Sequence, residues 1–282
     1  IKALRRDDVG LRLEAIDALA QLGAPAVPGL LDTLWLEVDT TQVKIINALA
    51  TIKDAAAVHD LQKATRAATP EVRLAAVDAL AAVGAPARDA LTGVLQHDDA
   101  GMRGRAVAAL GTLKDGKTVA DLVPLLQDGD AAVRLAVLAA LERIGLPAQP
   151  ALLDALQLPD AALRLRAVQA LGVIANDKAA DALLALQQDP DARVRVEVVK
   201  ALAALQDARV LDALVAMQTD GDATVRQTVV QQLKARARDA KAADAILAAL
   251  KDGHGAVRAE AVRTLAATAD PRKVTSLLAA LK

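Results

Sequence analysis

An arginine returns along this chain at nearly constant spacing, each time just ahead of the same apolar pattern. The steps between successive occurrences are 30 to 32 residues, and one position carries glutamine instead. The series is Arg12, Gln42, Arg73, Arg103, Arg134, Arg164, Arg195, Arg226 and Arg258. Self-similarity at such a period is typical of a solenoid, in which each unit packs only against its neighbours. The pattern therefore predicts a single continuous repeat array over residues 1–282, with a period of about 31 residues.

Each repeat reads as two helices. At 100° per residue, the positions one before the arginine and three, four, seven and ten after it fall on one side of a helix, and they are almost uniformly Val, Ile, Leu or Ala. A second apolar run with helical spacing precedes it, as in Leu152, Leu153 and Leu156. The predicted fold class is all-α, and each unit is a helical hairpin. We expect each leucine seven residues after the arginine, from Leu19 to Leu265, to be fully buried. Truncating Leu141 to Ala should then cost about 2–5 kcal/mol.

Boundary residues support this division. An aspartate stands four residues before most of the arginines, where its side chain can cap a helix start, as Asp99, Asp130 and Asp160 do. The ends of the arginine helices alternate in type. Units one, three and five have a glycine there, and units two, four and six have a polar pair. These residues are Gly23, Gly84 and Gly145, and Lys53-Asp54, Lys114-Asp115 and Asn176-Asp177.

The repeated arginine is predicted to point toward the packed side of its helix, where an unpaired guanidinium would be very costly. Aspartates four and six residues upstream, such as Asp130 and Asp128 for Arg134, can supply carboxylates. We infer a ladder of Asp/Arg pairs between neighbouring units. A row of arginines that binds anions is the less favoured interpretation.

The stretches Asp160 to Ile174 and Val119 to Leu125 carry a pattern that resembles HEAT-like repeats of the phycobilisome (PBS) lyase type. The resemblance spans the whole chain and implies a right-handed α-solenoid of about nine HEAT-like helical hairpins. Unit two departs from the pattern, with Val38 in place of the aspartate and Gln42 in place of the arginine, which leaves its rung of the ladder in doubt. The resemblance is specific for fold and weak for function, because such repeats serve many roles.

Both ends of the array read as open. Leu4 stands eight residues before Arg12, as Leu250 does before Arg258, so the chain begins inside a first helix. Val274 to Leu281 forms another first helix with no second helix after it. Solenoids usually close with polar capping units. We therefore expect a segment of a longer chain, with end-to-end contacts through the uncapped termini as one way of covering them.

The second helices of such superhelices line the concave side, so their outward columns are the binding candidates. One residue after the arginine the column is mostly apolar, whereas five residues after it the column changes from acidic to basic along the chain. The partner-binding candidates are Leu74, Asp78, Leu135, Ala139, Leu165, Gln169, Val196 and Lys200, together with the single tryptophan, Trp35. Two alternatives stay open. The apolar column can simply close contacts between helices, and Trp35 can fill a gap left by the missing rung of unit two.

Composition excludes several kinds of chemistry. The absence of cysteine excludes disulfides, thiolate metal sites and cysteine nucleophiles. The single serine, Ser276, lies in a terminal helix, and His59, His97 and His254 lie in separate units, so neither a catalytic triad nor a metal site is expected. A net charge of −1 argues against nucleic acid, and we interpret the basic run Lys234, Arg236 and Arg238 as a solvated surface. No apolar stretch approaches the roughly 18 residues that a membrane span needs. A cytoplasmic location is the default.

These observations predict a non-enzymatic scaffold without a cofactor, which binds a protein or peptide through its concave face. The alternative is a subunit like those of bilin lyases, acting on a tetrapyrrole. The family resemblance points toward that activity, but Trp35 is the one side chain that could stack on a chromophore.

Overall fold

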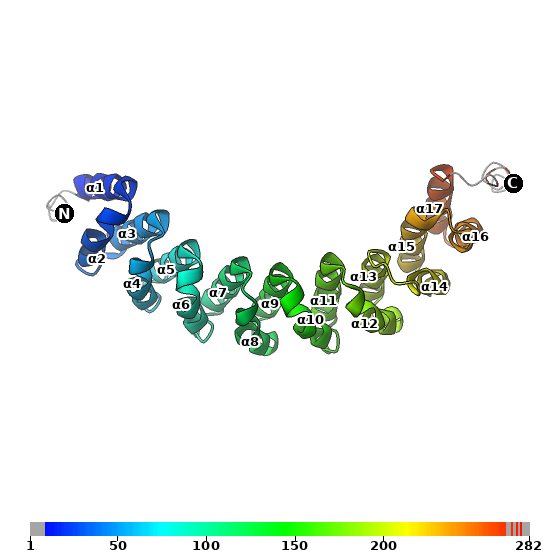
Figure 1. Ribbon diagram of the computed structural model, residues 1–282, viewed down its shortest axis with the longest axis horizontal. Coiled ribbons are helices and arrows are strands. Elements are labelled where there is room, and N and C mark those ends of the chain that lie inside the picture. The colour runs from blue at the N-terminus through cyan, green and yellow to red at the C-terminus, as the bar shows by residue number, and fades with distance from the viewer. Residues whose placement is uncertain (1–8, 269–271, 273–274, 276, 278–282) are drawn as a thin grey trace. The chain divides into compact units, whose positions relative to one another are not determined.

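The computed structural model describes residues 9–268 together with residues 272, 275 and 277 (Figure 1). Over this part the chain is helical and has no strand, which confirms the predicted all-α solenoid. It forms two compact units, residues 1–148 and 149–282. The handedness of the superhelix stays a prediction.

The repeated arginine, or Gln42 in its place, lies in each of nine described helices. Consecutive members of this row pack against each other within each unit. In the first unit they are α1 (Val9–Leu22), α3 (Asp39–Ile52), α5 (Pro70–Val83), α7 (Ala100–Leu113) and α9 (Ala131–Ile144). In the second unit they are α11 (Ala161–Ile174), α13 (Ala192–Ala203), α15 (Ala223–Leu233) and α17 (Gly255–Ala266).

The other row consists of the shorter first helices of the hairpins. In the first unit they are α2 (Val27–Leu34), α4 (Val58–Ala64), α6 (Arg88–Val94) and α8 (Val119–Leu122), which continues as the 3₁₀ turn η6 (Val123–Gln127). In the second unit they are α10 (Gln149–Ala155), α12 (Ala180–Ala185) with η9 (Leu186–Gln188), α14 (Val210–Ala216) with η10 (Met217–Thr219), and α16 (Ala240–Ala249). Figure 1 shows the two rows of the first unit as separate layers, with α2, α4, α6 and α8 on one side.

The core lies between the two rows and follows the predicted helical phase. Val133, Val137, Leu138 and Leu141 of α9 are all at most 1% exposed. The leucine seven residues after the arginine is buried in every helix from α3 to α17, and Leu19 of α1 is the exception, because it is half-buried. The residues that would form the first helix of its hairpin, 1–8, lie outside the described part, as does most of the predicted helix from Val274 to Leu281.

Helix boundaries agree with the predicted caps. Each of the capping aspartates accepts a hydrogen bond from a backbone N–H two residues later, and they are Asp99, Asp130, Asp160, Asp191 and Asp222. At the other end the predicted alternation is present. Gly23, Gly84 and Gly145 have φ of 76°, 82° and 80°, whereas Lys53, Lys114 and Ala175 adopt the left-handed conformation with φ of 59°, 53° and 47°. In unit six the left-handed residue is therefore Ala175, one position before the predicted pair. Asn176 instead caps the 3₁₀ turn η8 (Asp177–Ala179).

No helix in the described part of the chain combines the length and the apolar character that crossing a membrane requires.

Candidate functional site

The predicted ladder of Asp/Arg pairs between neighbouring repeats is present. Four arginines each donate two hydrogen bonds, from Nε and a terminal nitrogen, to both oxygens of an aspartate 25 or 26 residues later, at 2.7–2.9 Å. The pairs are Arg103–Asp128, Arg164–Asp189, Arg195–Asp220 and Arg226–Asp252. Arg12 makes a single bond of 2.9 Å to Glu37. These side chains are largely buried, so the pairs hold neighbouring repeats together.

The two upstream aspartates have separate roles, which the sequence did not distinguish. The aspartate six residues before an arginine pairs with the arginine of the preceding repeat. The aspartate four residues before an arginine caps the helix that carries this arginine. An arginine bonds its own loop only through the backbone, as Arg195 does by donating to the carbonyl oxygen of Asp189 at 2.7 Å.

The pairing lowers the pKa of the ladder carboxylates. For Asp128 the hydrogen bond from Arg103 is the largest cause. For Asp189 burial acts in the opposite direction, but the hydrogen bonds from Arg164 and from the backbone N–H of Asp191 outweigh it, so the pKa of Asp189 still lies below its ordinary value. These aspartates are therefore ionised structural partners near neutral pH.

The ladder is interrupted in the first unit. Gln42 donates to the carbonyl oxygen of Leu34 at 3.2 Å, and Ala67 occupies the place of its aspartate. The second repeat therefore lacks an Asp/Arg rung, as its departure from the pattern suggested. A second interruption was not anticipated. Within the described residues Arg73 makes no ion pair, because His97 stands at the loop position from which Asp128, Asp189, Asp220 and Asp252 bind the other arginines.

In the first unit the predicted binding residues of α5 and α9 lie at the surface of the arginine helices. Leu135 is 39% exposed, and Leu74 and Ala139 are half-buried. Asp78 is exposed and accepts two hydrogen bonds from Arg105 of α7, at 2.8 and 2.7 Å. A similar exposed pair, Lys44–Asp17 at 2.6 Å, joins α3 to α1. Ion pairs thus join α1 to α3 and α5 to α7 on this face.

The polar pairs give way to small side chains between α7 and α9. At Gly111 an added Cβ would lie 2.7 Å from the Cα of Ala140, so the two backbones approach closely there. At Gly104 an added Cβ would meet nothing within 4 Å, so this glycine faces open space. We call the surface formed by Gly104, Ala108, Leu135 and Ala139 the apolar window.

In the second unit the predicted residues lie on α11 and α13. Leu165 and Val196 are half-buried, whereas Val173, near the end of α11, is 69% exposed. The polar candidates are engaged within their own helices: Gln169 accepts from Arg166 at 3.5 Å, and Lys200 donates to Glu197 at 2.7 Å.

Trp35 lies elsewhere, directly after α2. Its Nε1 donates to Asp60 of α4 at 2.9 Å, and the ammonium of Lys63 lies 4.3 Å from the ring centroid. The side chain is 37% exposed. It lines a cleft of about 490 Å³ with His59, Gln62, Lys63, Arg66 and Ala67.

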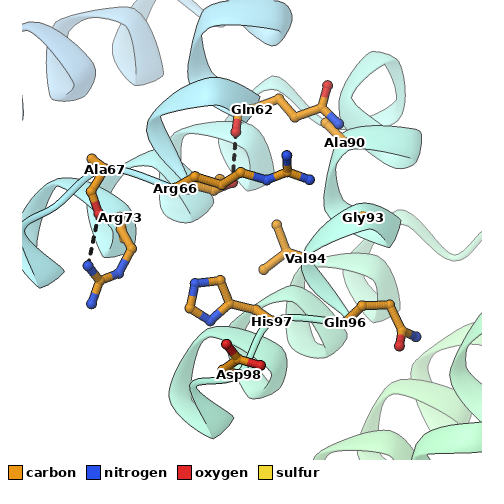
Figure 2. Close-up of a pocket in the computed structure, with 11 residues that line it drawn as sticks. Gln62, Arg66, Ala67, Arg73, Ala90, Gly93, Val94, Gln96, His97 and Asp98 are labelled. Carbon is orange, nitrogen blue, oxygen red and sulfur yellow. Dashed lines mark hydrogen bonds between the residues drawn. The ribbon is translucent and has the colours of Figure 1, made fainter.

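Two further clefts continue from there along the loop edge of the first unit. The first, of about 450 Å³, shares Gln62, Arg66 and Ala67 with the tryptophan cleft (Figure 2). The next, of about 410 Å³, shares Gln96, His97 and Asp98 with the 450 Å³ cleft. We call this series, from Trp35 to Asp128, the edge groove. Apart from Trp35, sequence reasoning missed it as a site, because the groove forms where the loop of one repeat meets the helices of the next, and such contacts depend on how the repeats pack. The available signal was a histidine at a position where other loops have aspartate.

The described residues contain no cluster of three or more side chains that could hold a metal ion. Nδ1 of His97 accepts from the backbone N–H of Asp99 at 3.0 Å, and the side chain of His254 caps α17. Ser276 lies outside the described residues.

The sequence model of HEAT repeats matches residues 37–103, 89–157, 149–234 and 216–282. The chain belongs to the HEAT-repeat family. Solved HEAT-like arrays share its fold. The structure of Kap121p bound to Nup53p is 15% identical with a TM-score of 0.68, and the match covers 99% of this chain and 38% of that one. A structure of Kap95p with RanGDP is 15% identical with a TM-score of 0.64, covering 99% and 46%. This chain thus spans less than half the length of either.

A more distant likeness is the CpcE and CpcF complex of phycocyanin lyase from Nostoc sp. PCC7120, at 21% identity and a TM-score of 0.43, covering 79% of this chain and 93% of that one. No curated protein sequence matches the chain.

Proposed function

We propose that this HEAT array is a non-enzymatic scaffold that binds a segment of another protein across the outward face of its arginine helices. The observation that carries the proposal is the apolar window. Leu135 of α9 is exposed, and Gly104, which holds the same repeat position on the neighbouring helix α7, would meet nothing within 4 Å of an added Cβ. Exposed apolar surface with a polar border is typical of an interaction site.

The window has a polar border on one side. The exposed Arg105–Asp78 pair lies next to it, between α7 and α5. An amphipathic segment fits this arrangement, because its apolar side chains can cover Leu135 and fill the space over Gly104 while its polar groups meet Arg105 and Asp78. Leu165 and Val196 offer a comparable apolar surface in the second unit, considered by itself. The solved arrays with the same fold support a partner of this class, since one is bound to Nup53p and another to RanGDP.

The test is capture of partners from the native cell extract by wild-type protein and by surface variants. Leu135→Asp and Gly104→Arg should each reduce capture of the same partner, because they place charge or bulk on the apolar window. Val262→Asp is the matched control, since Val262 of α17 is also 39% exposed but lies outside the proposed surface.

Circular dichroism identifies variants that fail to fold. Loss of helicity in Leu135→Asp would show that this leucine is a core residue, and equal capture by all the variants would reject the proposed face. Retention of a coloured tetrapyrrole in place of a protein would favour the lyase alternative.

A further inference from the structure

In the edge groove, the guanidinium of Arg73 is held as in the complete rungs, but no carboxylate of the described residues is bound to it. Arg73 of α5 donates from one terminal nitrogen to the carbonyl oxygens of Ala67 and Ala68, at 2.9 and 2.7 Å. Arg103 makes the same two contacts with its own loop, to His97 and Asp98, at 2.8 Å each. Arg103 then uses Nε and its other terminal nitrogen to bind both oxygens of Asp128. In Arg73 the Nε atom is buried and has no hydrogen-bond partner.

His97 explains the missing partner. It occupies the loop position of Asp128, and its Nδ1 accepts from the backbone N–H of Asp99 at 3.0 Å, as the carboxylate of Asp128 accepts from that of Asp130 at 2.8 Å. The histidine therefore keeps the turn of the loop and supplies no anion. The guanidinium is held as in the complete rungs, and only the carboxylate is absent. A buried donor without an acceptor is costly, so a ligand that satisfies it gains that energy.

The surroundings favour an anion from outside the chain. The cleft of about 450 Å³ is lined by Arg73, Arg66, His97 and Asp98 among others. Arg66, two residues after the end of α4, adds a second cation to the lining of this cleft, and Figure 2 shows its side chain extending toward Ala90 and Gly93, on the side away from Arg73.

Asp98 is the one acidic side chain in the lining, and it opposes an incoming anion. It stands at the loop position from which Glu37 reaches Arg12, but its side chain is one carbon shorter, and it makes no bond to Arg73.

We propose that the edge groove binds a carboxylate at Arg73, either an Asp or Glu side chain of a peptide or a free dicarboxylate. The carboxylate would lie between Nε and the free terminal nitrogen of Arg73, as the aspartates do in four rungs of this chain, with Arg66 as the second positive charge. A planar, two-oxygen acceptor is what the guanidinium edge fits best. This site lies on the loop edge and not on the apolar window, so it stands apart from the proposed scaffold face.

The experiment follows the Nε–Hε signal of Arg73 by NMR while one of three probes is added at constant ionic strength. The probes are the peptide acetyl-Gly-Glu-Gly-amide, glutarate and inorganic phosphate. We expect a saturable shift with a carboxylate probe, and the probe that saturates at the lower concentration identifies the source. A response to phosphate with none to either carboxylate would overturn the proposal, as would the absence of any saturable shift.

Four variants test the geometry through the affinity for the better carboxylate probe, followed by the signals of neighbouring backbone amides. Arg73→Gln, which copies the natural Gln42, should weaken binding at least about tenfold. His97→Asp should do the same, because its own carboxylate completes the rung. Gln96→Asp adds the same charge to the groove away from the rung and should weaken binding less, and Asp98→Asn should strengthen it. Equal binding by wild type and His97→Asp would refute the rung geometry, and circular dichroism confirms that each variant is folded.

Discussion

At the scale of single residues, each complete rung joins two loops through one guanidinium. Arg164 bonds the backbone of its own loop and both oxygens of Asp189, and Asp189 also accepts from the backbone N–H of Asp191 at 2.9 Å. The two side chains are 10% and 2% exposed. Breaking such a buried pair leaves a charge without a partner.

We predict that Asp189→Asn lowers the free energy of unfolding by about 3–5 kcal/mol. Asp78→Asn, which breaks the exposed pair with Arg105, should cost less than about 1 kcal/mol. Urea denaturation followed by circular dichroism measures both. Equal costs for the two variants would show that the rungs are no more than surface ion pairs.

The same carboxylates make the free energy of unfolding depend on pH. The pKa of Asp128, Asp189, Asp220 and Asp252 is lowered in the folded chain, and that of Asp191 falls from 3.8 to about 2 through its hydrogen bonds with Arg193. Groups with a lowered pKa stabilise the fold above their ordinary pKa, and this contribution disappears as the pH falls through the folded value.

We therefore expect the urea midpoint to change little between pH 7 and about pH 5 and to decrease as the pH falls below about 4. The urea midpoint of Asp128→Asn should decrease less steeply with falling pH than that of wild type, since one of the carboxylates with a lowered pKa is gone. A midpoint that rises on acidification would contradict the assignment.

At the scale of elements, two glycines of α7 should respond in opposite ways to the same substitution. Gly111→Ala drives a methyl group into the backbone of α9 and should destabilise the chain by about 1–3 kcal/mol. Gly104→Ala meets nothing within 4 Å and should stabilise it by about 0.4–1 kcal/mol, because alanine favours a helix interior. Thermal unfolding compares the two. Similar changes in both variants would show that the close approach of α7 and α9 does not determine stability.

The elements were predictable because their signals are local and repeated. Helix phase, the capping aspartates and the alternating helix ends follow from residues a few positions apart, and Gly84 and Lys114 both end their helices as the alternation predicts. Which arginine the loop carboxylate of Asp128 binds could not be predicted, since it depends on how one hairpin lies on the next. The edge groove escaped prediction for the same reason. It depends on His97 lying where Arg73 needs an anion, which is a contact between neighbouring repeats.

At the scale of the whole molecule, repeats that touch only their neighbours should lose stability locally. Leu80 of α5 and Leu202 of α13 are both 0% exposed and occupy the same place in their repeats, one in each unit. Truncating either to alanine should cost about 2–5 kcal/mol through the cavity it leaves.

In a nearest-neighbour array that loss is concentrated around the altered repeat and weakens with distance along the chain. Hydrogen exchange read by mass spectrometry should show Leu80→Ala accelerating exchange most in α3, α5 and α7, and Leu202→Ala most in α11, α13 and α15. Each variant serves as the control for the other. If instead both variants accelerated exchange equally in all these helices, the 282 residues would unfold as one cooperative body, and the array could not be treated as a sum of repeats and the contacts between them.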